Sequence, residues 1–144
     1  MTRKFLLPTA ILSAFAFGSA PAMANSVHID QFGFGNAAGG AQAGIGNAIG
    51  VFQDGVFNNS VTQQNGVGNL GVTGQSGFNN NADLLQNGNF NEAGVGQFGA
   101  NHNAILTQDG NGNIAAGVQV GNGCDANVSQ AGAGNVAAFV QSCP

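Results

Sequence analysis

Glutamine returns at every eleventh position of this chain, from residue 31 to residue 141, without an insertion or a deletion. The positions are Gln31, Gln42, Gln53, Gln64, Gln75, Gln86, Gln97, Gln108, Gln119, Gln130 and Gln141. A fixed period indicates a repeat architecture, in which each unit is one structural element stacked on its neighbours. The fold must therefore repeat every eleven residues, or at a multiple of eleven.

Two further columns follow the same period. Gly stands two residues after Gln, at Gly33, Gly44, Gly55, Gly66, Gly77, Gly88, Gly99, Gly110, Gly121 and Gly132, with Cys143 in this place after the last Gln. Asn stands five residues after Gln, at Asn36, Asn47, Asn58, Asn69, Asn80, Asn91, Asn113 and Asn135, with His102 and Cys124 as the exceptions. Ala is the usual residue two positions later, so each unit reads Q-x-G-x-x-N-x-A-x-x-x-Q.

The positions of Asn, Ala, the next apolar residue and Gln share one parity, so in an extended chain they point to one face. The apolar position holds residues such as Val51, Leu84 and Leu106, whereas all six acids fall on the opposite parity. This sorting predicts strands with Asn, Ala, the apolar residue and Gln inside. The G-x-x-N segment between strands is typical of a turn, because Gly accepts positive φ and Asn can bond its own backbone.

The units predict an all-β fold, a β-solenoid in which two eleven-residue strand-turn units make one rung of 22 residues. About five such rungs fit between residues 29 and 141, stacked about 4.8 Å apart. A right-handed helical supercoil also has an eleven-residue period. Gly and Asn in every unit disfavour it, since Gly in a helix costs about 1 kcal/mol.

The first 24 residues predict a secretory signal peptide. Arg3 and Lys4 precede an apolar stretch from Phe5 to Phe17, and small residues lead to Ala24. The stretch is too short for a membrane span, so we expect residues 1–24 to be removed and the repeat domain to occupy residues 25–144.

Charge excludes several functional classes. Residues 25–144 contain six acids and neither Lys nor Arg, so nucleic acid is not an expected partner, because phosphate contacts require cations. The acids are spread through the units, and no nucleophile, base and orienting group can be assembled. We expect no enzymatic activity, no cofactor and no metal site; His102 and Cys124 alone are too few ligands for a closed site.

Identical rungs would stack Gln on Gln and Asn on Asn, so that their amides form ladders along the axis and can be buried. The end rungs keep open strand edges, and the sequence offers no Lys or internal Pro in residues 25–143 to protect them. Stacking of further copies on these edges predicts a cross-β fibre.

The unit resembles the curlin repeat of bacterial curli subunits, and the likeness covers residues 29–141. The resemblance implies a secreted subunit of an extracellular amyloid fibre at the bacterial cell surface, used for adhesion and biofilm matrix. It also implies a surface nucleator and an outer-membrane secretion channel as partners besides the chain itself. Curli subunits generally carry a leader before the repeats, whereas here Gln31 comes six residues after Asn25.

Uniform units favour the major subunit over the surface nucleator, although the two cysteines would suit a specialised role. A monomeric solenoid that binds ice or another surface is the other alternative, but an ice-binding face needs a regular array of Thr, and Thr62, Thr73 and Thr107 are scattered. Cys124 and Cys143 fall at one corner of successive rungs. We expect them to form a disulfide, with free or intermolecular thiols as the alternative.

Overall fold

The computed structural model describes residues 24–144, and this part of the chain forms eleven strands joined by short turns. The predicted signal peptide therefore lies almost entirely outside the described residues. The strands are β1 (Ser26–Phe34), β2 (Ala37–Ile45), β3 (Ala48–Val56), β4 (Asn59–Val67), β5 (Leu70–Phe78), β6 (Asn81–Asn89), β7 (Glu92–Ala100), β8 (Asn103–Asn111), β9 (Ile114–Asn122), β10 (Asp125–Ala133) and β11 (Val136–Cys143).

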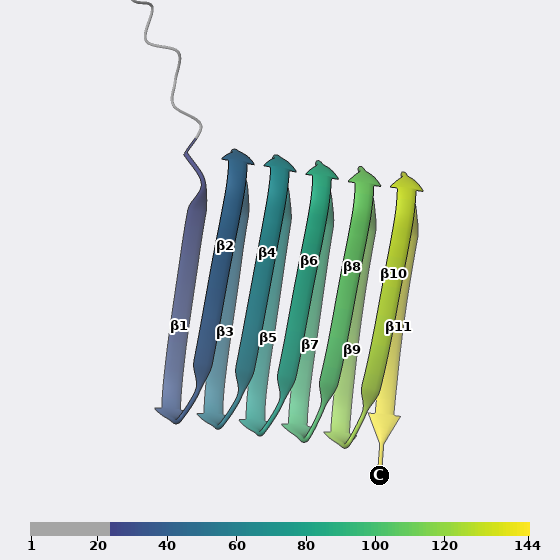
Figure 1. The fold of residues 1–144 in the computed structure, drawn as a ribbon. Helices are drawn as coiled ribbons and strands as arrows, with labels where there is room; N and C mark the ends of the chain where they lie inside the picture. The colour runs from purple at the N-terminus through teal and green to yellow at the C-terminus, as the bar shows by residue number, and fades with distance from the viewer. Residues whose placement is uncertain (1–23) are drawn as a thin grey trace, which may run out of the picture.

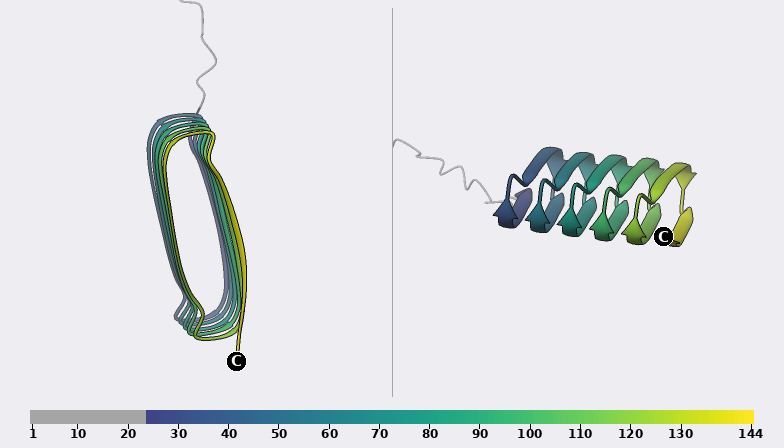
Figure 2. Two further views of the ribbon diagram at one scale, coloured as in Figure 1. Left: turned by 90° about the vertical axis from the view of Figure 1, so that its right-hand side faces the viewer. Right: turned by 90° about the horizontal axis from the view of Figure 1, so that it is seen from below.

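Odd-numbered and even-numbered strands form two separate sheets. The six-stranded sheet has the order β1-β3-β5-β7-β9-β11, and the five-stranded sheet has the order β2-β4-β6-β8-β10. The two sheets lie face to face as a flattened coil that rises steadily from β1 to β11 (Figures 1 and 2). The predicted β-solenoid is confirmed.

Each strand from β1 to β9 pairs with the strand 22 residues later in the chain, without a change of register. Gln53 lies beside Gln75 in the six-stranded sheet, and Gln64 lies beside Gln86 in the five-stranded sheet. The same offset holds in all nine strand pairs. One rung is therefore 22 residues, as the doubled period predicts, and about five rungs are stacked.

The interior is thin and partly polar. Leu84, Leu106, Val95 and several Ala residues form an apolar cluster in the middle rungs. The Gln and Asn side chains of the two repeated columns lie beside this cluster and are almost fully buried from Asn47 to Gln119. The ends are exposed because no further rung covers them within the described residues.

The corners differ in detail from the predicted G-x-x-N turn. Each strand continues through the Gly and one residue beyond it, which leaves only two residues between strands, such as Gly46 and Asn47. The first of these two residues has a positive φ in all ten corners, including Phe57 (φ 58°) and Phe90 (φ 57°). The backbone thus bends at two positions with positive φ, the column Gly and the first corner residue, such as Gly44 and Gly46. Strand pairing continues at the residue between them.

Three hydroxyl groups inside the solenoid, those of Ser60, Thr62 and Thr73, have no hydrogen-bond partner. Thr73 is 1% exposed and lies between Val51 and Val95 in its column. Burying a hydroxyl without a partner is destabilising, whereas an apolar group of similar shape avoids the loss of hydration.

We therefore expect Thr73→Val to raise the free energy of unfolding by about 1 kcal/mol. The control is Thr107→Val, because Thr107 is on the outward side of β8, where a change within about 0.5 kcal/mol is expected. Guanidinium unfolding followed by circular dichroism measures both variants. Loss of stability in Thr73→Val would show that the hydroxyl is satisfied.

Candidate functional site: amide ladders and solenoid ends

The Gln side chains form one continuous ladder in each sheet. Each Nε2 donates to the Oε1 of the Gln 22 residues later, in nine bonds of 2.6–2.9 Å from Gln31 to Gln141. All nine bonds point the same way along the axis. The ladders therefore have a direction, with the donor always on the side of the earlier rung.

Each Gln from Gln42 onward also joins the two sheets. Its Nε2 donates to the backbone carbonyl oxygen 16 residues earlier, at the start of a strand in the opposite sheet, in ten bonds of 2.7–3.0 Å. Both amide hydrogens of an interior Gln are thereby used, and its oxygen accepts one bond. This satisfaction explains why a polar side chain can be buried completely.

The Asn column stabilises the corners in a different way from a simple amide ladder. Asn Oδ1 accepts the backbone N–H of the Asn 22 residues later, at 2.9–3.1 Å. Asn Nδ2 donates to the carbonyl oxygen of the Gly 19 residues later, at 2.8–3.2 Å. Each Asn thus holds its own corner to the corner of the next rung.

The Gly column lies where successive backbones approach most closely. A Cβ placed on any of the nine glycines from Gly33 to Gly121 would lie 1.8–2.0 Å from the carbonyl oxygen of the residue below it in the next rung. These glycines also have φ between 106° and 133°. No other residue meets both conditions without a local change of backbone.

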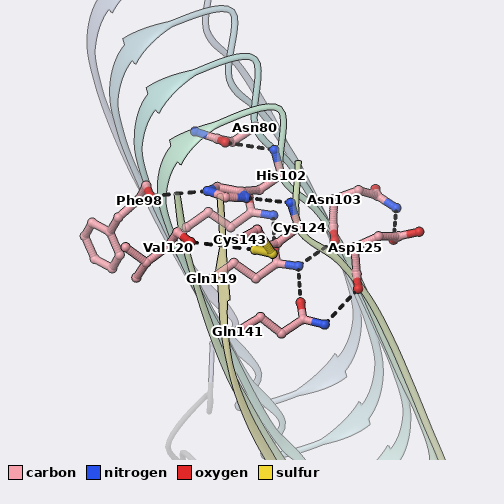
Figure 3. The surroundings of a disulfide bond; sticks show 11 residues. Asn80, Phe98, His102, Asn103, Gln119, Val120, Cys124, Asp125, Gln141 and Cys143 are labelled. Atoms are coloured by element: carbon pink, nitrogen blue, oxygen red, sulfur yellow. Dashed lines mark hydrogen bonds between the residues drawn. A yellow bond between two sulfur atoms is a disulfide. The ribbon is translucent and has the colours of Figure 1, made fainter. Parts of the chain in front are cut away.

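His102 replaces Asn in the corner column and reproduces two of the contacts that Asn makes in other corners (Figure 3). Its Nδ1 accepts the backbone N–H of Cys124 at 3.1 Å, in the role of Asn Oδ1. Its Nε2 lies 3.2 Å from the carbonyl oxygen of Phe98, four residues earlier, which corresponds to the contact of Asn47 Nδ2 with the carbonyl oxygen of Ala43. The pair of contacts requires the neutral ring with its proton on Nε2.

Because His102 acts as a substitute for Asn, we expect His102→Asn to change the free energy of unfolding by less than about 1 kcal/mol. His102→Leu should cost about 2 kcal/mol or more, because it leaves the Cys124 N–H and the Phe98 carbonyl without partners. Guanidinium midpoints of the two variants provide the comparison. Equal losses would mean that ring volume, and not hydrogen bonding, is what the corner needs.

Cys124 and Cys143 form a disulfide with a Cα–Cα distance of 5.6 Å. Their separation of 19 residues equals the separation between each Asn Nδ2 and the Gly oxygen that it contacts in the other corners. The covalent bond therefore takes the place of a recurring corner hydrogen bond (Figure 3). It connects the end of β11 to the start of β10.

The two ends of the ladders are complementary. Within residues 24–144, no Gln side chain donates to the Oε1 atoms of Gln31 and Gln42 at one end. At the other end, Gln130 and Gln141 donate to backbone oxygens of the opposite sheet, and the described chain supplies no further Gln oxygen for them. One end thus presents acceptors, and the other presents donors.

The outward sides of the two sheets differ in polarity. Exposed large apolar side chains on the six-stranded sheet are Phe32, Phe34, Phe52, Leu70, Val72, Phe78, Phe98, Ile114, Val118, Val120, Val136 and Val140, whereas on the five-stranded sheet they are Ile45, Val67 and Leu85. We call the former side the apolar face. Phe32 and Phe52 lie on it with ring centroids 5.8 Å apart.

Few residues are charged, and no Asp or Glu side chain among residues 24–144 is buried in the interior. On the surface of β1, His28 Nε2 lies 3.0 Å from a carboxylate oxygen of Asp30. The same residues contain no group of three potential metal ligands. None of their segments is a helix of sufficient length and hydropathy to span a membrane.

The fold defines the class of protein: a two-sheeted parallel β-solenoid whose interior is held by directional amide ladders. Residues 77–110 match the family model described as Curlin associated repeat. This match supports the resemblance to the curlin repeat that the repeat unit shows. No curated protein matches the chain significantly.

Proposed function

We propose that this chain is a structural subunit of an extracellular curli-type amyloid fibre, and that it polymerises by edge-to-edge stacking of solenoid rungs. The observation that carries the proposal is the complementarity of the two ends. Both sheets end in strands whose outer edges are unpaired within the described residues, and unpaired edges favour the addition of further strands.

The ladders give the stacking a direction. Gln130 and Gln141 at one end can donate to Gln31 and Gln42 of the next copy, as every Gln inside the chain does to its successor. Head-to-tail contact of this kind is heterologous and does not close on itself, so it generates a filament. The curlin repeat supports the same reading.

The uniform units favour the major subunit over the surface nucleator. Secretion after removal of residues 1–24, display at the bacterial cell surface, and a role in adhesion and biofilm matrix belong to the proposal, as do the nucleator and the outer-membrane channel as partners. This function requires no catalysis and no cofactor.

The test is polymerisation of residues 25–144 after dilution from denaturant, followed by thioflavin T fluorescence and electron microscopy. We expect fibres with a meridional reflection near 4.8 Å, formed after a lag that preformed seeds remove. A stable β-rich monomer that never polymerises would contradict the proposal and would favour a monomeric surface-binding solenoid.

A charged substitution at one end of the Gln ladder tests whether this end forms the contact between copies. Gln42→Lys places a cation on the interior side of the terminal rung, where the next copy should cover it, and we expect elongation to be strongly slowed. Ala41→Lys adds the same charge one residue away on the exposed outward side and should polymerise like the unmodified chain. Equal elongation rates for the two variants would show that the end with Gln42 is not part of the contact between copies.

A further inference from the structure

The described chain contains an odd number of equivalent units. Eleven strands are divided into six in one sheet and five in the other. Every unit carries the same Gln column, and successive units alternate between the sheets along the coil (Figures 1 and 2). Each unit is therefore related to the next by a half turn about the axis and half a rung of rise.

The odd number of units determines how a second copy can continue the coil. The unit that would follow β11 belongs above β10, in the stack of the five-stranded sheet, because β11 itself lies above β9. A second copy in the same orientation would instead place its β1 above β11. Its β2 would then lie two strand spacings above β10, with one strand missing between them.

A missing strand would leave two buried strand edges without partners, and unpaired buried N–H and C=O groups are strongly unfavourable. If the second copy is turned by half a turn about the axis, its β1 lies above β10 and its β2 lies above β11. Both stacks then continue without a gap.

The half turn also matches the chemistry of the two ends. Gln130 then meets Gln31 of the next copy, and Gln141 meets Gln42, so both ladders continue in the direction that they have inside the chain. The backbone N–H of Asn36 comes to the Oδ1 of Asn135, as each Asn N–H does 22 residues after its predecessor.

We infer that successive copies in the fibre are related by a half turn about the fibre axis, with β1 of each copy paired to β10 of the copy before it. The inference rests on the proposed function and names the contact by which the chain polymerises. The apolar face then alternates from one side of the fibre to the other, and neither side carries a continuous apolar stripe.

Cysteine pairs across the junction distinguish the two orientations. In the half-turn arrangement Asp30 of one copy lies beside Ser129 of its neighbour, because these residues precede the paired Gln31 and Gln130. In the unrotated arrangement Asp30 lies beside Val140. All three side chains are on outward positions, and adjacent strands bring such pairs within disulfide reach.

The experiment mixes two single variants, each with its Cys124–Cys143 disulfide already formed, lets them polymerise, and oxidises the fibres. We expect D30C with S129C to give a covalent dimer on a non-reducing gel, and D30C with V140C to give at most a few per cent of that amount. Dominant linkage of D30C to V140C overturns the inference but leaves the proposed function intact. Absence of fibres from the unmodified chain overturns both.

Helical reconstruction from electron micrographs provides an independent readout. Eleven half-rungs predict a rise of about 26 Å per copy with a rotation near a half turn, whereas the unrotated arrangement predicts about 29 Å with little rotation. Deletion of residues 70–80 removes one unit and makes the number even, so the half turn should disappear. A fibre of unmodified chains with the longer rise and no half turn contradicts the inference, whatever the cross-linking yields.

Discussion

Replacing Gln64 with Leu is expected to lower the free energy of unfolding by at least about 3 kcal/mol. Gln64 is 2% exposed and accepts a bond from Gln42, while it donates to Gln86 and to the carbonyl of Ala48. Leu fills a similar volume but removes these three hydrogen bonds, and it leaves the buried Oε1 of Gln86 without its donor. The measurement is the shift of the guanidinium midpoint of residues 25–144.

The neighbouring residue is the control for this variant. Gln63 lies on the outward side of β4 and is exposed, so Gln63→Leu should change the free energy of unfolding by no more than about 0.5 kcal/mol. The two substitutions alter the same chemical group one position apart, on opposite sides of the sheet. Similar losses at both positions would contradict the role of the ladder.

Gly77→Ala is expected to have the larger effect, with a loss above about 4 kcal/mol or failure to fold. Its Cβ would lie 1.9 Å from the carbonyl oxygen of Gly99, and Gly77 has a φ of 133°. The obstacle is backbone of the next rung, which cannot move without breaking strand pairing. Circular dichroism and thioflavin T fluorescence should both show the loss.

Gly74→Ala provides a matched comparison three residues away in the same strand. A Cβ at Gly74 meets no atom within 4 Å, and this residue has no positive φ. We expect unchanged or slightly higher stability, since Ala restricts the unfolded chain more than Gly does. If Gly77→Ala were as stable as Gly74→Ala, the close approach of successive rungs at the Gly column would be wrong.

The eleven-residue period was sufficient to predict the solenoid, the 22-residue rung and the interior parity, because strand geometry allows only one sorting of Gln, Asn and apolar residues. The positive φ at the first corner residue was not predictable. That position holds Gly46, Phe57, Gly68 and Asn79 in four successive corners, so its common feature is a backbone conformation and not a residue type.

The hydrogen-bond partners of the corner residues could not be predicted from the sequence either. The Asn column suggests an amide ladder, yet Asn Oδ1 mainly accepts backbone N–H groups, a preference that depends on where the two-residue corner places the next rung. The substitution of Asn by His102 looks like a broken pattern in the sequence. Only the positions of both ring nitrogens show that it preserves the bond to the next corner N–H and the contact with the carbonyl four residues earlier.

We expect each chain to form its own solenoid inside the fibre, so that strands pair with strands 22 residues apart in one molecule. Solid-state NMR of fibres labelled with ¹³C at the carbonyl of Ala93 alone tests this claim directly. In the solenoid, identical residues of successive copies are about 26 Å apart, so no ¹³C–¹³C dipolar dephasing is expected. Strong dephasing from a spacing of about 4.8 Å would show flat chains stacked residue on residue, and would contradict the account.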